Sequence, residues 1–238
     1  MITLVDNKYI IRVNSRLIFK ERLEYITDIL NQVSKDLIED DEELENKFWI
    51  ENGITDLIDL SKDDYEVFTE QLETFKNKHK HLPQILYKSL VVSIYSVIET
   101  TLSELITSTE NIVTKRIKYK HLRNSGNEIE NYLNYFNLIH NLELTNLNIL
   151  LSDLKDYADI RNNIVHYNGN LKEDNQGRKQ RIKKFVKKDS TIEIESNENL
   201  YIKDCQFVFK FLELTEKFGF ELFKNYKIDK LSTCYNNG

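Results

Sequence analysis

Apolar residues recur every three or four positions along most of the chain, and this spacing predicts a protein built mainly of helices. A first apolar stripe runs over residues 15–33, and a second helix is expected over residues 42–58. Ser61 and Asp64 have the spacing of a capping box, which predicts that a third helix starts at Ser61. The same spacing predicts further helices over residues 84–107, 127–142, 145–166 and 204–226.

The strongest of these patterns follows Pro83 and covers residues 84–107. From Leu90 to Ile98 the sequence is apolar on nearly all sides, as expected of a central helix. Glu99 interrupts this pattern. It is either an exposed helix residue or an acid that faces a site formed with a neighbouring helix.

Two stretches have the two-residue period of strands instead. Residues 1–13 are rich in β-formers on both sides of Asp6 and Asn7, which favours a short strand pair. Residues 185–188 and 191–196 alternate around a turn, which predicts a hairpin before the last helix. The expected fold class is therefore mainly α: a helical bundle with a short β-hairpin between the last two helices.

Composition supports a globular protein, with 40% hydrophobic and 30% charged residues and only six glycines and one proline among 238 residues. No apolar run approaches the roughly 18–20 residues needed to cross a membrane, and the first residues do not resemble a signal peptide. The two cysteines, Cys205 and Cys234, are too few for a disulfide scaffold. A cytoplasmic protein without membrane association is expected. Residues 1–79 are interpreted as a mostly helical extension and residues 80–238 as the main helical domain, although the two can equally form one continuous domain.

The net charge of −6 argues against a general nucleic-acid coat, but the charges are unevenly distributed. Residues 36–51 are strongly acidic, whereas residues 178–188 hold seven Lys or Arg residues in eleven positions. Such a run is either a solvated face or a surface that contacts RNA phosphates. The candidate RNA-binding residues are Arg178, Lys179, Arg181, Lys183, Lys184, Lys187 and Lys188.

Most catalytic motifs are missing from the sequence. It contains no glycine-rich phosphate loop, no GxSxG elbow and no histidine or cysteine spacing typical of zinc, so neither a metal nor a cofactor is expected. What remains is the segment RNNIVH, residues 161–166, at the end of an apolar helix. A histidine exchanges protons near neutral pH, and an arginine stabilises charge on a phosphate, which together suffice for metal-free RNA cleavage.

Helical geometry sets a limit on this site. Asn162 lies one turn before His166 on the same helix face, whereas Arg161 and His166 are five positions apart, or roughly 140° around the axis. One helix therefore brings the two together only through the length of the arginine. A second copy of the chain across a two-fold axis would place two such pairs in one cleft.

The spacing by itself is weak evidence, because residues 116–121 contain a second Arg-x4-His. The copy at residues 161–166 is favoured because it ends an apolar helix, has an amide after its arginine and carries Ile164 and Val165 as an apolar anchor. The alternative interpretation is purely structural. Both residues would then be helix-end cations that interact favourably with the helix dipole.

RNNIVH and its surroundings resemble the HEPN superfamily, whose motif is an arginine, usually a polar residue such as asparagine, and a histidine after four to six positions. The resemblance covers roughly residues 80–226 and includes the long apolar helix upstream and the glycine after the motif. It implies a helical bundle that usually dimerises, and many members are metal-independent endoribonucleases of toxin–antitoxin, abortive-infection and antiviral systems. The resemblance implies that His166 transfers the proton, that Arg161 stabilises the phosphate and that Asn162 orients the substrate or the histidine. Glu99 is a looser fourth candidate.

The function expected from this resemblance is an endoribonuclease that cleaves RNA by attack of the 2′-hydroxyl. It would act as a homodimer with a composite active site, as a toxin or antiviral-defence effector with an antitoxin or defence-system partner. The alternative is a non-catalytic module that binds a nucleotide, RNA or a protein. In a third interpretation, the acidic residues 36–51 mimic nucleic acid in a protein-interaction antitoxin.

Overall fold

The computed structural model describes residues 4–36, 41–54, 61–112, 118–124, 127–140 and 144–225. Within these ranges the mainly α fold class is confirmed, and a two-stranded antiparallel hairpin precedes the last helix. The helices are α1 (Leu4–Asp36), α2 (Asp41–Glu51), α3 (Lys62–Ile112), α4 (Glu128–His140), α5 (Thr145–Tyr167), α6 (Gln176–Val186) and α7 (Gln206–Asn225), and the strands are β1 (Ile192–Ile194) and β2 (Leu200–Ile202).

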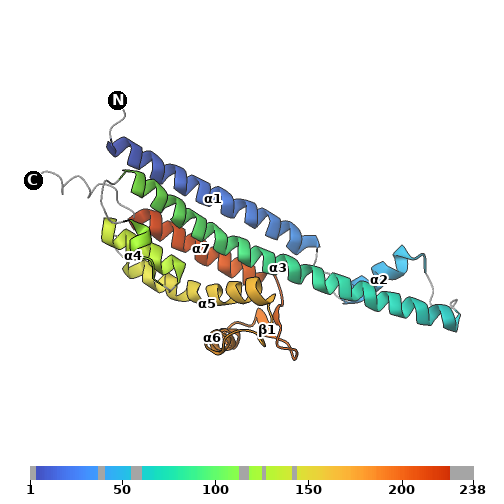
Figure 1. The fold of residues 1–238 in the computed structure, drawn as a ribbon. Coiled ribbons are helices and arrows are strands. Elements are labelled where there is room, and N and C mark those ends of the chain that lie inside the picture. The colour runs from blue at the N-terminus through green and yellow to red at the C-terminus, as the bar shows by residue number, and fades with distance from the viewer. Residues whose placement is uncertain are drawn as a thin grey trace, which may run out of the picture.

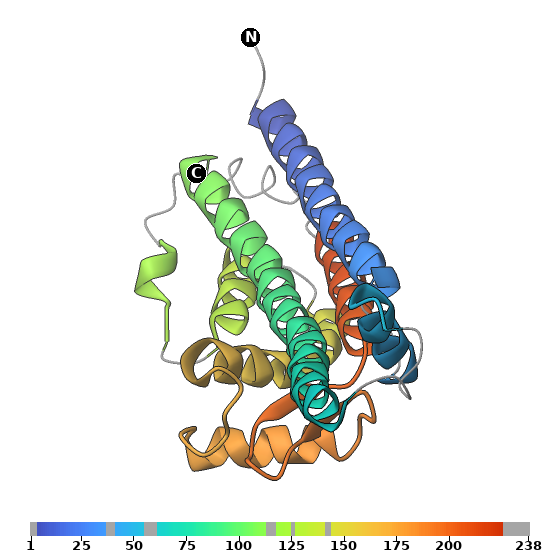
Figure 2. The ribbon, with the colours of Figure 1, turned by 90° about the vertical axis from the view of Figure 1, so that its right-hand side faces the viewer.

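Helix α3 is the central element of the bundle (Figure 1). Its C-terminal half packs against α1, α4, α5 and α7, while its N-terminal part extends beyond the bundle and has α2 packed against it (Figure 1). Helix α6 and the hairpin lie together on one side of the bundle, next to α5 (Figures 1 and 2).

The main hydrophobic core lies between α1, α3, α4, α5 and α7. Tyr157 of α5 stacks on Phe211 of α7 with ring centroids 4.3 Å apart and planes inclined by 5°. Gly219 allows α7 to approach α1 closely, because a Cβ atom there would overlap the ring of Phe19. The first contact holds α5 against α7, and the second holds α7 against α1.

A second, smaller cluster joins α2 to the projecting half of α3. It consists of Phe48 and Trp49 from α2 and Leu72 from α3, with the partly buried Phe68 and Phe75 packed against it. The two clusters share no residue, so the α2–α3 arm has its own apolar contacts.

The position expected to divide the chain, residue 79, lies inside α3. Helix α1, which belongs to the expected extension, contributes Phe19, Leu23 and Leu30 to the main core. The division at residue 79 stays a prediction, but the two parts share one long helix.

Two strand predictions are wrong. Residues 4–13 are the start of α1, because the helical stripe that follows continues into them and outweighs their local β-propensity. Residues 185 and 186 end α6, which begins where the side chain of Asn175 accepts a hydrogen bond from the backbone N–H of Arg178 at 2.9 Å. Ile182 and Phe185 then face the core at helical spacing.

Two helix boundaries also differ from the prediction. Helix α2 ends at Glu51 instead of residue 58, and Gly53 follows it with a φ of 71°; residues 55–58 lie outside the described part of the chain. Pro83 lies inside α3 instead of opening a new helix. A proline in a helix removes one hydrogen bond, and here the apolar face on both sides of it outweighs that loss.

Contrary to the expectation from the sequence, one stretch of α3 is long and apolar enough to span a membrane. More than half of that stretch is buried inside the protein. Central helices of helical bundles have this composition, and α3 occupies that place here.

Candidate active site at the end of α5

The segment RNNIVH lies in the last turns of α5, which ends at Tyr167 and is followed by Asn168 and Gly169. Asn168 has a left-handed backbone with a φ of 52°, and its N–H donates to the carbonyl of Asn163. Gly169 has a φ of 89°, and a Cβ atom there would lie 2.9 Å from the Nζ atom of Lys88. Only glycine meets both conditions without strain.

Arg161 is held by side chains from two helices. Its Nη2 atom donates to Oε2 of Glu99 on α3 at 3.1 Å, and its Nη1 atom donates to Oδ1 of Asn162 at 2.8 Å. The guanidinium carbon lies 5.2 Å from the centre of the Tyr95 ring, which adds a cation–π contact. The Nε atom is buried without an acceptor among the described residues.

Glu99 pairs with this arginine in a partly desolvated position, where its side chain is 28% exposed. Burial raises the pKa of Glu99; the charge of Arg161 lowers it in part, and the nearby Glu128 raises it further. The adjacent phenol is also affected, since burial raises the pKa of Tyr95 to about 12. The cluster therefore combines a fixed cation with an acid that ionises less readily than usual.

His166 is exposed at the last turn of α5. Its ring has an edge-on contact with Tyr167, with centroids 6.2 Å apart. In the described part of the chain, no hydrogen bond joins His166 to Arg161, Asn162 or Glu99. The structure thus brings together three of the four candidate catalytic residues and leaves the histidine open to solvent, one turn beyond Asn162.

Asn163 is a motif residue whose role the sequence did not reveal. It is fully buried, and its Nδ2 atom donates to the carbonyl of Asn170 and to Oδ2 of Asp174, both at 3.0 Å. The carboxylate of Asp174 also accepts from the backbone N–H of Asn175 and from Arg178. The sequence did contain a sign that Asn163 is buried, because this residue falls on the apolar face of α5 between Ile160 and the helix end.

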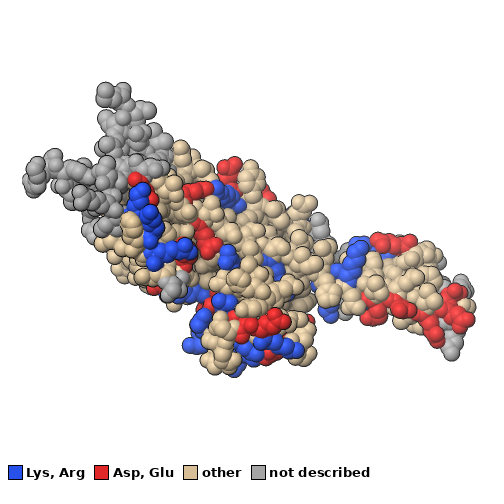
Figure 3. All heavy atoms as spheres, in the orientation of Figure 1, with Lys and Arg blue, Asp and Glu red and all other residues tan. Residues whose placement is uncertain are grey.

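The expected RNA-binding run lies on α6 and just after it, and four of its seven cations are paired with acids. Arg178 pairs with Asp174 at 3.1 Å, and Arg181 makes two bonds to Asp159 at 2.6 and 2.9 Å. Lys179 and Lys183 share Glu198 at 2.7 and 3.0 Å. Basic and acidic side chains accordingly alternate over this part of the surface (Figure 3).

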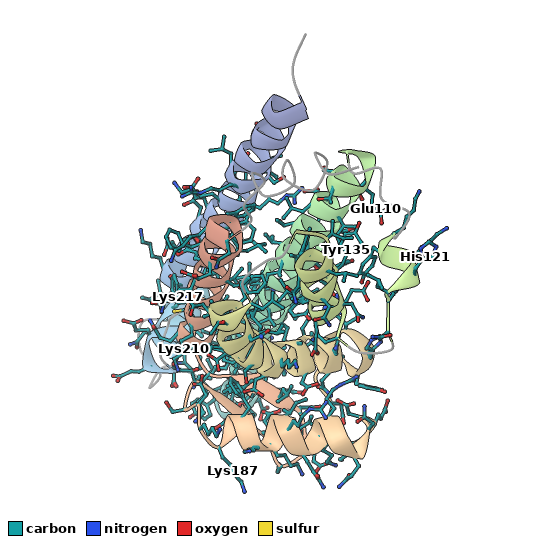
Figure 4. The ribbon with its side chains drawn as sticks, turned by 90° about the vertical axis from the view of Figure 1, so that its left-hand side faces the viewer. Glu110, His121, Tyr135, Lys187, Lys210 and Lys217 are labelled. Carbon is teal, nitrogen blue, oxygen red and sulfur yellow. The ribbon has the colours of Figure 1, made fainter. Side chains whose placement is uncertain are left out.

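The remaining three, Lys184, Lys187 and Lys188, have no ion pair among the described residues. Lys187 points away from the bundle (Figure 4). The cations of the run that have no ion pair therefore gather at the C-terminal end of α6. Arg181, by contrast, anchors α6 to α5 through Asp159, which lies two residues before Arg161.

The second Arg-x4-His is placed differently. Arg116 lies outside the described residues, and His121 ends a short 3-10 helix, Tyr119–His121, on the outside of the bundle (Figure 4). The Nδ1 atom of His121 accepts the backbone N–H of Lys118 at 3.3 Å. This histidine therefore belongs to a short, exposed 3-10 helix and not to the end of a core helix.

A cavity of about 680 Å³ lies elsewhere, between α1, α7 and the start of α5. It is lined by Phe19, Ile149 and Phe220 among others. Leu150, at its α5 edge, precedes Arg161 by eleven residues, which is about 16 Å along a helix. The described residues contain no cluster of three or more His, Cys, Asp or Glu side chains placed to hold a metal ion.

Comparison with family models, curated proteins and solved structures finds no match to this chain. The function of this protein is therefore inferred from the geometry at the end of α5.

Proposed function

We propose that this protein is a metal-independent endoribonuclease that cleaves RNA by attack of the 2′-hydroxyl. The observation that carries the proposal is the pairing of Arg161 with Glu99 across α5 and α3, beside a histidine that remains exposed on the same helix end.

Each residue has a defined part in the reaction. His166 removes the proton of the 2′-hydroxyl, and the 2′-oxygen attacks the adjacent phosphorus. Arg161 stabilises the charge that develops on the phosphate oxygens as the bond to the 5′-oxygen breaks. The departing 5′-oxygen takes up a proton from solvent water, which leaves a 2′,3′-cyclic phosphate and a 5′-hydroxyl. Glu99 and Asn162 keep the guanidinium in place.

The active unit is proposed to be a homodimer. Arg161 and His166 diverge by roughly 140° around the axis of α5, so a single chain presents them in different directions. A two-fold axis beside the end of α5 would bring the histidine of one chain to the arginine of the other. Sedimentation or light scattering of the purified protein tests the dimer directly.

The cleavage test uses the wild type and the variants R161A and H166A, each incubated with cellular RNA in the presence of EDTA. The wild type is expected to release fragments with 2′,3′-cyclic phosphate ends, whereas both variants are inactive. H121A is the matched control, because it removes the histidine of the other Arg-x4-His. Cleavage that survives both R161A and H166A would contradict the proposal.

The biological role that we propose is a cytoplasmic toxin or antiviral-defence effector, restrained by an antitoxin or another defence partner. Cells that express the wild type should stop growing, while cells that express H166A grow normally. Equal growth of the two cultures, with equal amounts of protein, would argue against a toxic effector.

The second candidate is a non-catalytic module that binds RNA, a nucleotide or a protein. It is favoured by the state of Arg161, since both of its terminal nitrogens already have partners within the chain. This candidate predicts that RNA binds to the wild type and to H166A equally and that neither protein cleaves it.

A further inference from the structure

Lys88 is a cation at the end of α5 that the motif does not include. Its Nζ atom lies 3.4 Å from the carbonyl oxygen of Asn168, two residues after His166. The side chain is half-buried, and among the described residues no carboxylate lies within ion-pair distance of it. Lys179 and Lys183, by contrast, both have Glu198 as a partner.

The face of α3 that carries Lys88 is the face that forms the candidate site. Lys88 contacts the end of α5, and Tyr95 and Glu99 contact Arg161 further along the same helix. The spacings of seven and four residues place these three side chains on one stripe of α3. Along α5, His166 lies between Arg161, which contacts Glu99 of α3, and the helix end at Asn168, which contacts Lys88 of α3.

A lysine near the end of a helix commonly bonds the last carbonyls, and the contact with Asn168 is of this kind. That role does not require burial, since an exposed lysine does it at lower cost. Burial lowers the pKa of Lys88, and Glu195 on the hairpin opposes this shift only in part. The side chain is thus held in a position where an anion would improve its environment.

We infer that Lys88 binds a phosphate of the RNA substrate next to His166. Lys88 supplies a positive charge at the end of α5, whereas the cations of α6 that are paired with acids do not offer one there. Arg161 and Lys88 would then contact the substrate from the two sides of the histidine. Gly169 keeps the space around the ammonium open, because a Cβ atom there would lie 2.9 Å from Nζ.

This inference rests on the proposed function, and its test separates the two. The full-length protein with the H166A substitution is mixed with a fluorescein-labelled single-stranded oligouridylate, and Kd is measured by anisotropy over a range of salt concentrations. K88Q removes the charge, K88R retains it, and K20A removes an exposed lysine of α1 as the matched control. K88M, which keeps the apolar stem, replaces K88Q if the glutamine variant does not fold.

K88Q is expected to weaken binding roughly five- to tenfold and to reduce the slope of log K against log salt by about one, while K88R and K20A retain the slope. A lower melting temperature with unchanged Kd and slope would show that Lys88 only caps the helix, which overturns the inference. If the wild type cleaves RNA and K88Q binds it normally, the inference fails and the proposed function stands. If the wild type neither binds nor cleaves RNA, both fail.

Discussion

The two faces of the segment at residues 161–166 differ in where their partners lie. Asn163 points inward, is fully buried and bonds only to groups of its own chain, Asn170 and Asp174. His166 points outward and has no hydrogen-bond partner among the described residues. The inward face therefore determines how the helix end is built, and the outward face is available to a substrate. Substitutions on the two faces should separate stability from activity.

The largest expected effect belongs to His166 on the outward face. H166A should reduce RNA cleavage about a hundred- to ten-thousandfold, the range for a lost general base. Its free energy of unfolding should stay within about 0.5 kcal/mol of the wild type, because the side chain is exposed. Cleavage assays and urea unfolding followed by circular dichroism measure the two. A large loss of stability would show that this histidine is structural.

Next in size is the loss of Asn163 on the inward face. N163A removes a donor from the buried carboxylate of Asp174 and from the carbonyl of Asn170, which should cost about 2–3 kcal/mol of stability. The neighbouring N162A is the matched control and should cost under about 1 kcal/mol, since Asn162 is only partly buried. Equal losses in urea unfolding would contradict the division into two faces.

Gly169 gives a smaller effect at the junction of the two faces. G169A forces a Cβ atom into a left-handed backbone with a φ of 89° and against Lys88, which should cost about 1–2 kcal/mol. G177A is the control, because Gly177 lies in the first turn of α6 with only ordinary contacts. That substitution should be neutral or slightly stabilising. Thermal unfolding of both variants tests the difference.

The smallest effect concerns the pH dependence caused by Glu99. Its pKa in the folded protein is raised, chiefly by burial, so the folded state binds its proton more tightly than the unfolded state does. The stability due to this proton is fully present below the unfolded pKa, near 4.5, and is lost as the pH rises through the raised folded value.

The E99Q variant has no such proton, so the stability of the wild type relative to E99Q should fall as the pH rises above about 4.5. Urea unfolding of both proteins in a pH series measures this difference. E213Q, at an exposed glutamate of α7, is the control and should follow the wild type. A difference between wild type and E99Q that does not change with pH would contradict the raised pKa.

The sequence was sufficient for features that depend on local pattern. The stop of α5 follows from Asn168 and Gly169, which tolerate a left-handed backbone. For Glu99 the sequence left two alternatives, an exposed helix residue or an acid that faces a neighbouring helix. The structure has it paired with Arg161 of α5. The helix stop needs only two adjacent residues, whereas the partner of Glu99 lies 62 positions away in the sequence.

The features that the sequence did not reveal depend on contacts between distant residues. Lys183 meets Glu198, and Arg181 meets Asp159 twenty-two positions away, so a run that looks basic in the sequence is largely neutralised in space. Lys88 reaches the end of α5 from a position eighty residues earlier. No local period encodes such pairs, since each depends on how the helices pack.

The division of the apolar residues into two clusters has a spectroscopic consequence. Trp49, the one tryptophan of the chain, belongs to the small cluster of the α2–α3 arm. Its fluorescence therefore reports the surroundings of the arm, whereas the tyrosines Tyr95 and Tyr157 lie in the main core. Melting curves from tryptophan emission and from circular dichroism will coincide only if arm and bundle unfold as one cooperative unit.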